Sequence, residues 1–278
     1  MIQQNTPEWL ELRKSKIGAS DAPVIMGDSP WTTPYQLWLE KTGQSEGRPQ
    51  NYAMRRGHEM EPIARDYFQR ATGMWFEPEV VISSERDWMM ASLDGISLGG
   101  GELLEIKNPG VEDHEEAKKG RVPKKYVAQN QHALCASGGN LLYYFSYRSP
   151  EDTATVEVKP DLEYIEKLLA AEEEFMRCVK EGTPPPQTDR DYLPRADREW
   201  IEVCEKWKAA KAAAEEEEFY RKELIRLSAG KSSQGGGVRL RKGTRAGSVQ
   251  YKKIPELVGV DLDKYRTAPL ETWRLECI

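Results

Sequence analysis

The segment from Ala91 to Pro109, which reads ASLDGISLGGGELLEIKNP, limits the possible folds more than any other part of the chain. Three consecutive glycines, Gly99–Gly101, favour a turn. Leu103, Leu104 and Ile106 follow the turn as a short apolar run, which predicts a buried or half-buried β-strand. We therefore expect the core to be built around a sheet that contains this strand.

Charged side chains within this segment predict a chemical site. Side chains two residues apart on a strand point to the same face, so Glu105 and Lys107 are expected to lie roughly 7 Å apart on one side. Asp94, which precedes a glycine, adds a second carboxylate. Carboxylate oxygens are the ligands that Mg²⁺ prefers, and a lysine beside them can stabilise developing negative charge. Taken alone, a Glu-x-Lys pair is also common as a solvated pair on an exposed strand.

Five stretches of the sequence, taken in order, resemble one known family. They are WLELRKSKIGASDAPVIMG from Trp9, RRGHEMEPIARDYF from Arg55, SLDG from Ser92, LLEIKNP from Leu103 and VPKKYVAQNQHAL from Val122. Together they resemble the lambda-type phage exonucleases, also called YqaJ-like viral recombinases, of the PD-(D/E)xK nuclease superfamily. The resemblance covers residues 6–182. Leu93 stands where the family name has its proline, at a position that often varies in the superfamily.

This resemblance implies an α/β fold with a restriction-endonuclease-like mixed β-sheet flanked by helices. It implies an exonuclease, dependent on Mg²⁺ or Mn²⁺, that degrades one strand of linear double-stranded DNA from 5′ to 3′. The remaining 3′ single-stranded tails would serve phage recombination by strand annealing. The implied partners are double-stranded DNA ends, a single-strand annealing protein, and further copies of the chain in a trimeric ring.

The resemblance also assigns roles to residues of the metal site. Asp94 and Glu105 are expected to bind the metal, helped by Glu61 and by the backbone carbonyl of Ile106. Lys107 is expected to position and activate the attacking water. For Glu61, which falls within a predicted helix over 54–72, the alternative is an exposed helix glutamate.

A second group of residues is assigned by resemblance to a pocket for the 5′-phosphate of the DNA end. Its members are Arg13, Ser20, Ser92 and Gln129. Other interpretations stay open, because Arg13 suits a surface charge, Ser20 a helix cap and Gln129 a solvated helix position. Gln131, on the same predicted helix as Gln129, is a further candidate for DNA contact.

Composition restricts the class of protein. The chain of 278 residues is 31% charged and 38% hydrophobic and carries a net charge of −6, which argues against a protein that simply coats nucleic acid. No apolar run is long enough for a membrane span and no signal pattern is visible, so a cytoplasmic location without membrane contact is expected. The four cysteines are far apart, which predicts reduced thiols and no cysteine-bound metal cluster.

Local patterns predict the order of the elements. Helices are expected over 6–14, 22–26, 35–41, 54–72, 123–137 and 161–180, and strands over 75–83, 88–98, 103–107, 141–148 and 153–159. Residues 17–21 read as a turn and residues 110–121 as a loop or short helix. The stiff TPPPQ stretch at 183–187 predicts a boundary between a nuclease domain, 1–182, and a C-terminal part, 183–278.

The C-terminal part is expected to form an appendage of a long helix and a β-hairpin. The helix spans 197–227, and Trp200 and Trp207 lie on an apolar side that needs a partner surface. The predicted hairpin pairs Val238–Leu240 with Val249–Tyr251 across a glycine-bounded turn.

One face of this hairpin carries Arg239, Arg241 and Lys252, which makes it a candidate DNA-binding surface. Basic residues on edge strands equally serve to prevent unwanted strand pairing. The appendage could also pack on a neighbouring subunit or receive the annealing protein.

Two other interpretations of the chain remain open. One is an endonuclease or repair nuclease of the same superfamily, which would cut closed circles. The other is a non-catalytic module that binds DNA ends or the annealing protein. The presence of Asp94, Glu105 and Lys107 argues against the second.

Overall fold

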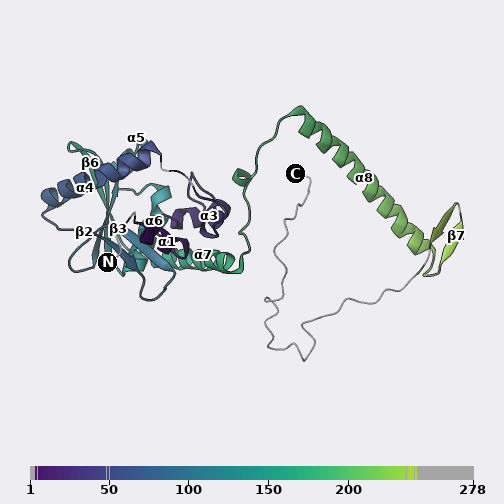
Figure 1. The fold of residues 1–278 in the computed structure, drawn as a ribbon, viewed down its shortest axis with the longest axis horizontal. Coiled ribbons are helices and arrows are strands. Elements are labelled where there is room, and N and C mark those ends of the chain that lie inside the picture. The colour runs from purple at the N-terminus through teal and green to yellow at the C-terminus, as the bar shows by residue number, and fades with distance from the viewer. Residues whose placement is uncertain are drawn as a thin grey trace, which may run out of the picture. The chain divides into compact units, whose positions relative to one another are not determined.

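The computed structural model describes residue 4, residues 6–47, residue 49, residues 51–235, residues 237–240 and residue 242. The chain divides into two compact units, Met1–Leu193 and Pro194–Ile278 (Figure 1). Residues 183–193, which the sequence assigned to the C-terminal part, make hydrogen bonds to the first unit. Arg190, for example, donates from its two Nη atoms to the carbonyl oxygens of Ser29 and Pro30, both at 2.9 Å.

The helices of the first unit follow the predicted positions closely. They are α1 (Pro7–Lys14), α2 (Ala22–Ile25), α3 (Pro34–Lys41), α4 (Tyr52–Thr72), α5 (Val111–Lys118), α6 (Lys124–Ser137), α7 (Leu162–Glu181) and the short 3₁₀ helix η1 (Asp189–Asp191). Local chemistry explains several ends. The Thr6 side chain caps α1 by accepting from the Trp9 amide, and Gly73 ends α4 with a left-handed φ of 74°.

The strands of the first unit form one six-stranded mixed sheet. They are β1 (Ile17–Gly18), β2 (Glu77–Ile82), β3 (Met89–Ile96), β4 (Glu102–Lys107), β5 (Leu141–Ser149) and β6 (Asp152–Val158). The order is β1-β3-β4-β5-β6, with β2 also paired to β3. β4 runs antiparallel to β3 and parallel to β5, so it is an interior strand. This confirms the predicted fold class.

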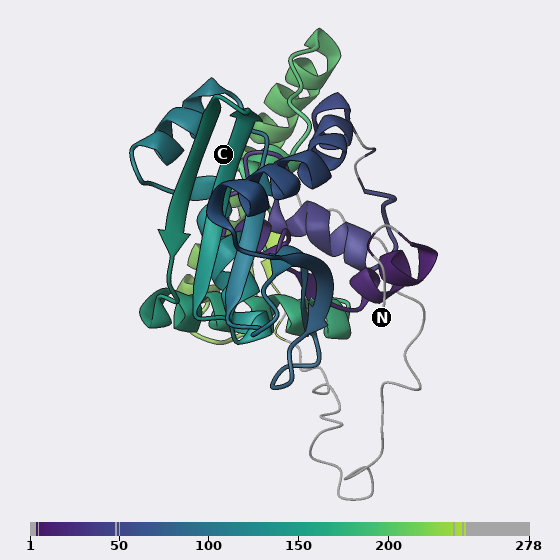
Figure 2. The same ribbon diagram turned by 90° about the vertical axis from the view of Figure 1, so that its left-hand side faces the viewer.

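Helices cover both faces of this sheet. On one face, Ala64 and Phe68 of α4 pack against Leu104 and Ile106 of β4, and Figure 2 shows α4 lying across the strands. On the other face, the strand side chains pack against α6 through a second cluster that includes Leu103, Ala133, Leu134, Leu142 and Tyr144. β4 is therefore buried on both sides, and its charged residues lie at the end of a rigid interior strand.

The structure differs in two details near α2 from what the sequence suggested, although residues 19–21 form the expected turn. The segment expected to be a turn contains β1, which pairs in parallel with Met89 and Met90 of β3. The residue at the cap position of α2 is Asp21 rather than Ser20. The strand was missed because two residues carry no periodic pattern, and only the distant β3 makes them extended.

The second unit consists, in its described part, of α8 (Arg198–Leu227) and a hairpin of β7 (Ser233–Gly235) and β8 (Val238–Leu240). Asp197 caps α8 by accepting from the Trp200 amide at 3.0 Å. The long helix and the hairpin are confirmed, but β8 pairs with β7, which precedes it. The expected partner, Val249–Tyr251, lies outside the described residues.

Among the residues described here, no helix combines the length and the apolar character that a bilayer crossing requires.

Candidate active site

The end of β4 gathers the charged residues that the alternation of the strand predicts. Glu105 is 3% exposed, and its Oε1 accepts a hydrogen bond from Gln129 Nε2 of α6 at 2.6 Å. Lys107 forms an ion pair with the same carboxylate. The two side chains share one face of β4 because they are two residues apart on a regular strand.

Asp94 reaches the same place from β3. Its Oδ2 accepts a hydrogen bond from the backbone N–H of Ile106 at 2.7 Å, which fixes the carboxylate against β4. The next residue, Gly95, allows this close approach. A Cβ atom there would lie 2.6 Å from the Cβ of Phe76 and 3.2 Å from that of Leu104.

The third carboxylate, Glu61, comes from α4 and is accompanied by an arginine. Arg65, one helical turn later, pairs with the Glu61 carboxylate. The Arg65 Nε also donates to the backbone carbonyl of Asp94 at 2.6 Å. Arg65 therefore ties α4 to β3 and holds Glu61 over the end of the sheet. The sequence analysis missed Arg65, although its position four residues after Glu61 on a helix was visible.

Burial and mutual repulsion change the acidity of these carboxyl groups. Burial is the main cause that raises the pKa of Asp94 to about 6, and the neighbouring Glu61 charge adds to it. Burial also raises the pKa of Glu105 to about 7. The Lys107 charge opposes this rise, and the Asp94 charge adds to it. The pKa of Glu61 is raised by burial and by Glu105, although Arg65 opposes this. The three carboxylates therefore lie close enough to repel one another.

The lysine of the site is held in its charged form. Burial alone would lower the pKa of Lys107, but the carboxylates of Glu105 and Asp94 outweigh it and raise the pKa above its usual value. Its Nζ also lies 5.3 Å from the centre of the Tyr126 ring, a favourable cation–π distance. Lys107 is thus an ammonium that donates hydrogen bonds at this site.

The donor set suits a hard divalent cation, because buried carboxylates that repel one another are stabilised by positive charge. In the part of the chain that is described, no three His, Cys, Asp or Glu side chains are already arranged around a common metal position. The Glu61 and Glu105 oxygens instead face Arg65, Gln129 and Lys107. A bound ion would replace some of these contacts.

A second cluster forms around Arg13 of α1. Its Nη2 donates to Ser20 Oγ and to Asp21 Oδ1, each at 3.1 Å. Its guanidinium carbon lies 4.8 Å from the centre of the Trp9 ring, and the Trp9 indole N–H donates to Ser92 Oγ at 2.9 Å. Arg13 thus contacts Ser20 directly and is connected to Ser92 through Trp9.

Gln129, the fourth residue of the pocket expected from the sequence, contacts Glu105 instead. The glutamine therefore lies at the carboxylate cluster, where it contacts Glu105 of β4. Its amide nitrogen donates to a carboxylate oxygen, so it also restrains Glu105.

A buried ion pair supports the Arg13 cluster. The Asp21 side chain accepts from Arg13 through Oδ1 and from Lys41 Nζ through Oδ2, the latter at 2.7 Å. Lys41 Nζ also donates to the carbonyl oxygens of Arg13 and Lys16, at 2.7 and 2.6 Å. Burial would raise the pKa of Asp21, yet Lys41 and Arg13 lower it to about 2. No local signal in the sequence indicated this pair.

The other predicted DNA contacts are placed differently. Gln131 is 4% exposed, donates to the Lys159 carbonyl at 3.0 Å and accepts from the Asp161 amide at 2.9 Å. It therefore anchors the start of α7, and its amide group is occupied by these backbone contacts. Arg239 is exposed on β8, and its Nε donates to Gln234 at 2.8 Å. Arg241 and Lys252 lie outside the described residues.

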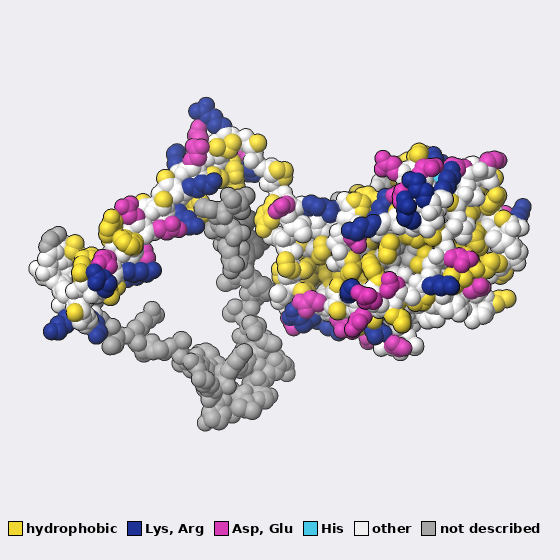
Figure 3. Space-filling view, turned by 180° about the vertical axis from the view of Figure 1, so that it is seen from behind, with side chains coloured by type: hydrophobic (Ala, Val, Ile, Leu, Met, Phe, Trp, Pro, Cys, Tyr) yellow, Lys and Arg dark blue, Asp and Glu magenta, His cyan; other side chains and the backbone are white. Residues whose placement is uncertain are grey.

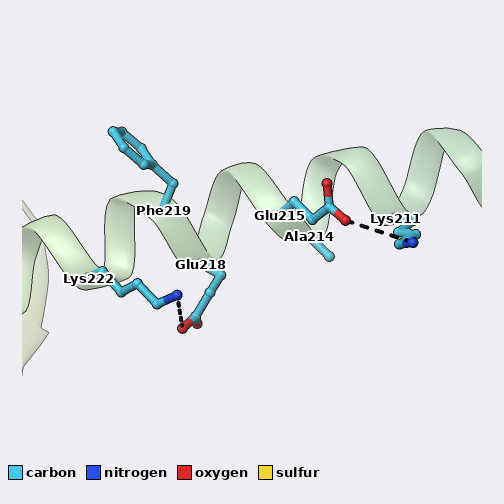
Figure 4. A pocket seen from close by; sticks show the side chains of 6 residues that line it. All are labelled: Lys211, Ala214, Glu215, Glu218, Phe219 and Lys222. Carbon is cyan, nitrogen blue, oxygen red and sulfur yellow. Dashed lines mark ion pairs between the residues drawn. The ribbon is translucent and has the colours of Figure 1, made fainter.

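A surface hollow of about 410 Å³ lies along α8 of the second unit. Figure 4 shows that all six of its lining residues project from one helix, with Lys211 paired to Glu215 and Lys222 to Glu218. A hollow between neighbouring side chains of one exposed helix encloses no ligand. The chemistry of the first unit is therefore the better guide to function.

Known proteins are similar to this chain both in sequence and in fold. Residues 8–140 match the YqaJ-like viral recombinase domain family. The uncharacterized protein YqaJ of Bacillus subtilis (strain 168) is 29% identical over 192 residues, which are 67% of this chain but only 60% of that protein. Among solved structures, the alkaline exonuclease LHK-Exo from Laribacter hongkongensis has a TM-score of 0.56 at 25% identity, covering 74% of this chain and all of that one.

LHK-Exo in complex with dAMP gives a similar result, with a TM-score of 0.57 and 25% identity over 64% of this chain and 94% of that chain. The matched residues include every member of the carboxylate cluster and the arginine cluster. Over residues 8–140 this chain is therefore similar to the YqaJ-like viral recombinase domain family, and its fold is similar to that of the alkaline exonuclease LHK-Exo.

Proposed function

We propose that this protein is a metal-dependent exonuclease that degrades one strand of linear double-stranded DNA from 5′ to 3′. The product would be a 3′ single-stranded tail for phage recombination by strand annealing. The observation that carries the proposal is the set of contacts at the end of β4, where Lys107 pairs with Glu105, the Ile106 N–H donates to Asp94, and Arg65 joins Glu61 to the backbone of Asp94. The similarity to an alkaline exonuclease supports it.

The carboxylates of Asp94, Glu105 and Glu61, with the Ile106 carbonyl, would hold Mg²⁺ or Mn²⁺. When bound, such an ion supplies a Lewis acid and stabilises charge on the leaving oxygen. The Ile106 N–H keeps Asp94 in place, and Gln129 and Lys107 orient Glu105. Because Lys107 is protonated, it orients water and stabilises the negative charge that develops on the phosphate.

Arg13, Ser20 and Ser92 would bind the 5′-phosphate of the DNA end, and Gln129, which contacts Glu105, would complete the pocket. A terminal phosphate carries more charge than an internal diester, so an arginine with hydroxyl donors discriminates in its favour. Ser20 already accepts a hydrogen bond from Arg13, and Ser92 from Trp9. The dAMP bound to LHK-Exo supports this proposal, because dAMP is a mononucleotide unit of DNA.

We also infer partners beyond the DNA end. A trimeric ring and a single-strand annealing protein follow from the family, and Arg239, Arg241 and Lys252 are candidates for DNA contact outside the active site. On the face drawn in Figure 3, basic and acidic side chains are interspersed rather than gathered into one basic patch. Local basic residues would therefore decide DNA affinity. Replacing these three residues by glutamine should reduce the slope of log affinity against log salt concentration by about 0.9 for each phosphate contact that is lost.

The test is a strand-specific digestion assay with Mg²⁺. Linear duplexes with a fluorophore near the 5′ or the 3′ end of one strand, with and without 5′-phosphate, and a closed circular duplex are incubated with the full chain. Loss of the 5′-proximal label first, preference for 5′-phosphate and an intact circle are expected. Cutting of the circle would indicate an endonuclease, and binding without any cleavage would indicate a non-catalytic module.

Matched variants make this assay specific for the carboxylate cluster. Asp94→Ala and Glu61→Ala should lower the rate by orders of magnitude with the fold intact. Asp66→Ala serves as the control, because Asp66 is an exposed carboxylate of the same helix that pairs only at the surface with Arg70. Equal rates for Glu61→Ala and Asp66→Ala would remove Glu61 from the proposed site.

A further inference from the structure

An exposed tryptophan lies in the loop between α2 and α3. Trp31 is 49% exposed, which is unusual for so large an apolar side chain. Its backbone is nevertheless ordered, because the hydroxyl of the buried Ser29 accepts hydrogen bonds from the amides of Trp31 and Thr32, both at 3.3 Å.

The same loop is fixed from outside by η1. Arg190 donates to the carbonyls of Ser29 and Pro30, and Asp191 accepts from the hydroxyl of Thr33. These contacts join segments about 160 residues apart in the chain. The exposed indole is therefore held on a rigid support, which is what a binding surface needs.

A line of cations and rings connects Trp31 to the active site. Lys125 Nζ lies 5.1 Å from the centre of the Trp31 ring and 5.4 Å from that of Tyr126. Lys107 Nζ lies 5.3 Å from the same Tyr126 ring. The Trp31 ring is thus no more than about 16 Å from Lys107, a distance covered by roughly five nucleotides of one strand at 3.4 Å each.

We propose that Trp31, with Lys125 beside it, is a stacking subsite for a nucleobase of the DNA strand close to the point of cleavage. Every base has a π-face that stacks on an indole ring, so such a subsite binds any sequence. Lys125 contacts one part of the ring and pairs with Asp113 at 2.6 Å, and a phosphate of the bound strand would share its positive charge with that carboxylate. This inference rests on the proposed function and adds to it a contact outside the carboxylate and arginine clusters.

The chain provides matched controls for both residues. Trp75 is also strongly exposed, but its indole N–H donates to Glu77 at 2.8 Å, and the described residues place no cation over its ring. Lys124 precedes Lys125 and pairs with Asp28 at 2.7 Å, and its side chain is 86% exposed. Neither control residue belongs to the line that leads to Lys107.

The experiment uses the full chain in EDTA, so that DNA is bound but not cut. The probe is a 5′-phosphorylated duplex with 2-aminopurine at one of the first five positions of the 5′-ended strand, whose fluorescence falls when the base stacks. Wild type, Trp31→Phe and Trp75→Ala should quench the probe at one of these positions, and Trp31→Ala should not. Trp31→Ala should raise the Kd about five- to hundredfold, with Trp31→Phe recovering most of the loss.

Lys125→Met should weaken DNA binding more than Lys124→Met does, and it should reduce the salt dependence of DNA binding.

Equal Kd values and equal quenching for Trp31→Ala and Trp75→Ala would overturn the subsite. A change in oligomeric state of Trp31→Ala with unchanged DNA binding would also overturn it and assign Trp31 to a protein interface. If Trp31→Ala does not fold, the quenching by Trp31→Phe and Lys125→Met decides. If the wild type neither binds nor cuts DNA, the proposed function itself fails. If the wild type cuts DNA and Trp31→Ala binds DNA as tightly as the wild type, only the subsite is refuted.

Discussion

Replacing Lys41 by methionine tests the buried ion pair under the Arg13 cluster. In the wild type, the Asp21 carboxylate is balanced by two cations, Lys41 and Arg13, and also accepts from the Gly18 amide at 3.0 Å. Methionine keeps much of the volume of lysine but removes the charge and its hydrogen bonds. Asp21 would then be a buried carboxylate with one counter-charge instead of two.

The size of the effect follows from the acidity of Asp21. Its pKa falls from 3.8 to about 2 in the folded protein, which corresponds to roughly 2.5 kcal/mol of stability at neutral pH. Because the folded pKa is the lower one, this stability is present above about pH 4 and is lost as the pH falls through about 2. Breaking a buried pair by removing one partner costs about 3–5 kcal/mol.

The assay is thermal and urea unfolding of the full chain, followed by circular dichroism. Lys41→Met should lower the Tm by roughly 6–20 °C, at 2–4 °C per kcal/mol for a unit of this size. The double variant Asp21→Asn/Lys41→Met should be less destabilised than the two single changes added together. Lys14→Met is the control, since Lys14 pairs with Glu11 at the surface and should change little. A Tm for Lys41→Met equal to that of Lys14→Met would refute the reasoning.

Three further predictions concern the active site and the core. Lys107→Met should lower turnover at least a hundredfold while DNA binding, measured by anisotropy, stays near wild type; near-normal turnover would contradict the role of Lys107. Arg13→Ala should reduce the ratio of digestion rates for 5′-phosphate and 5′-hydroxyl duplexes about tenfold, and an unchanged ratio would exclude the pocket. Burial alone would lower the pKa of His132, but the Glu172 carboxylate, 2.7 Å from its Nδ1, raises the pKa above its usual value. This pair should therefore stabilise the fold below about pH 6.5, and the stabilisation should be lost as the pH rises through the raised pKa. Urea midpoints at pH 6 and 9 should differ less in Glu172→Gln than in wild type, and an equal difference would contradict this.

Local signals were sufficient to predict most elements of this chain. A threonine before a proline marks the start of α1, and glycines with left-handed φ end α4 and α6. The alternation of β4 placed Glu105 and Lys107 on one face, and their ion pair follows from it. Such features depend on neighbours within about one helical turn or two strand residues, so the sequence records them directly.

Other features depend on contacts between distant segments. β1 is extended only because it pairs with β3, and Asp21 stays charged at low pH because Arg13 and Lys41, each from another helix, reach it. The hydrogen bond between Trp9 and Ser92 joins residues 83 positions apart. No local pattern encodes such partners, because their effect exists only after the core has packed.

The sequence by itself therefore determined the α/β class, the order of most elements and the identity of Asp94, Glu105 and Lys107 as a candidate site. Only the tertiary structure decided which side chains restrain them: Arg65 on Glu61, and Gln129 on Glu105. The physical reason is that helix and strand periodicity act over a few residues, whereas burial, charge balance and pKa depend on whatever the folded chain brings within a few ångströms.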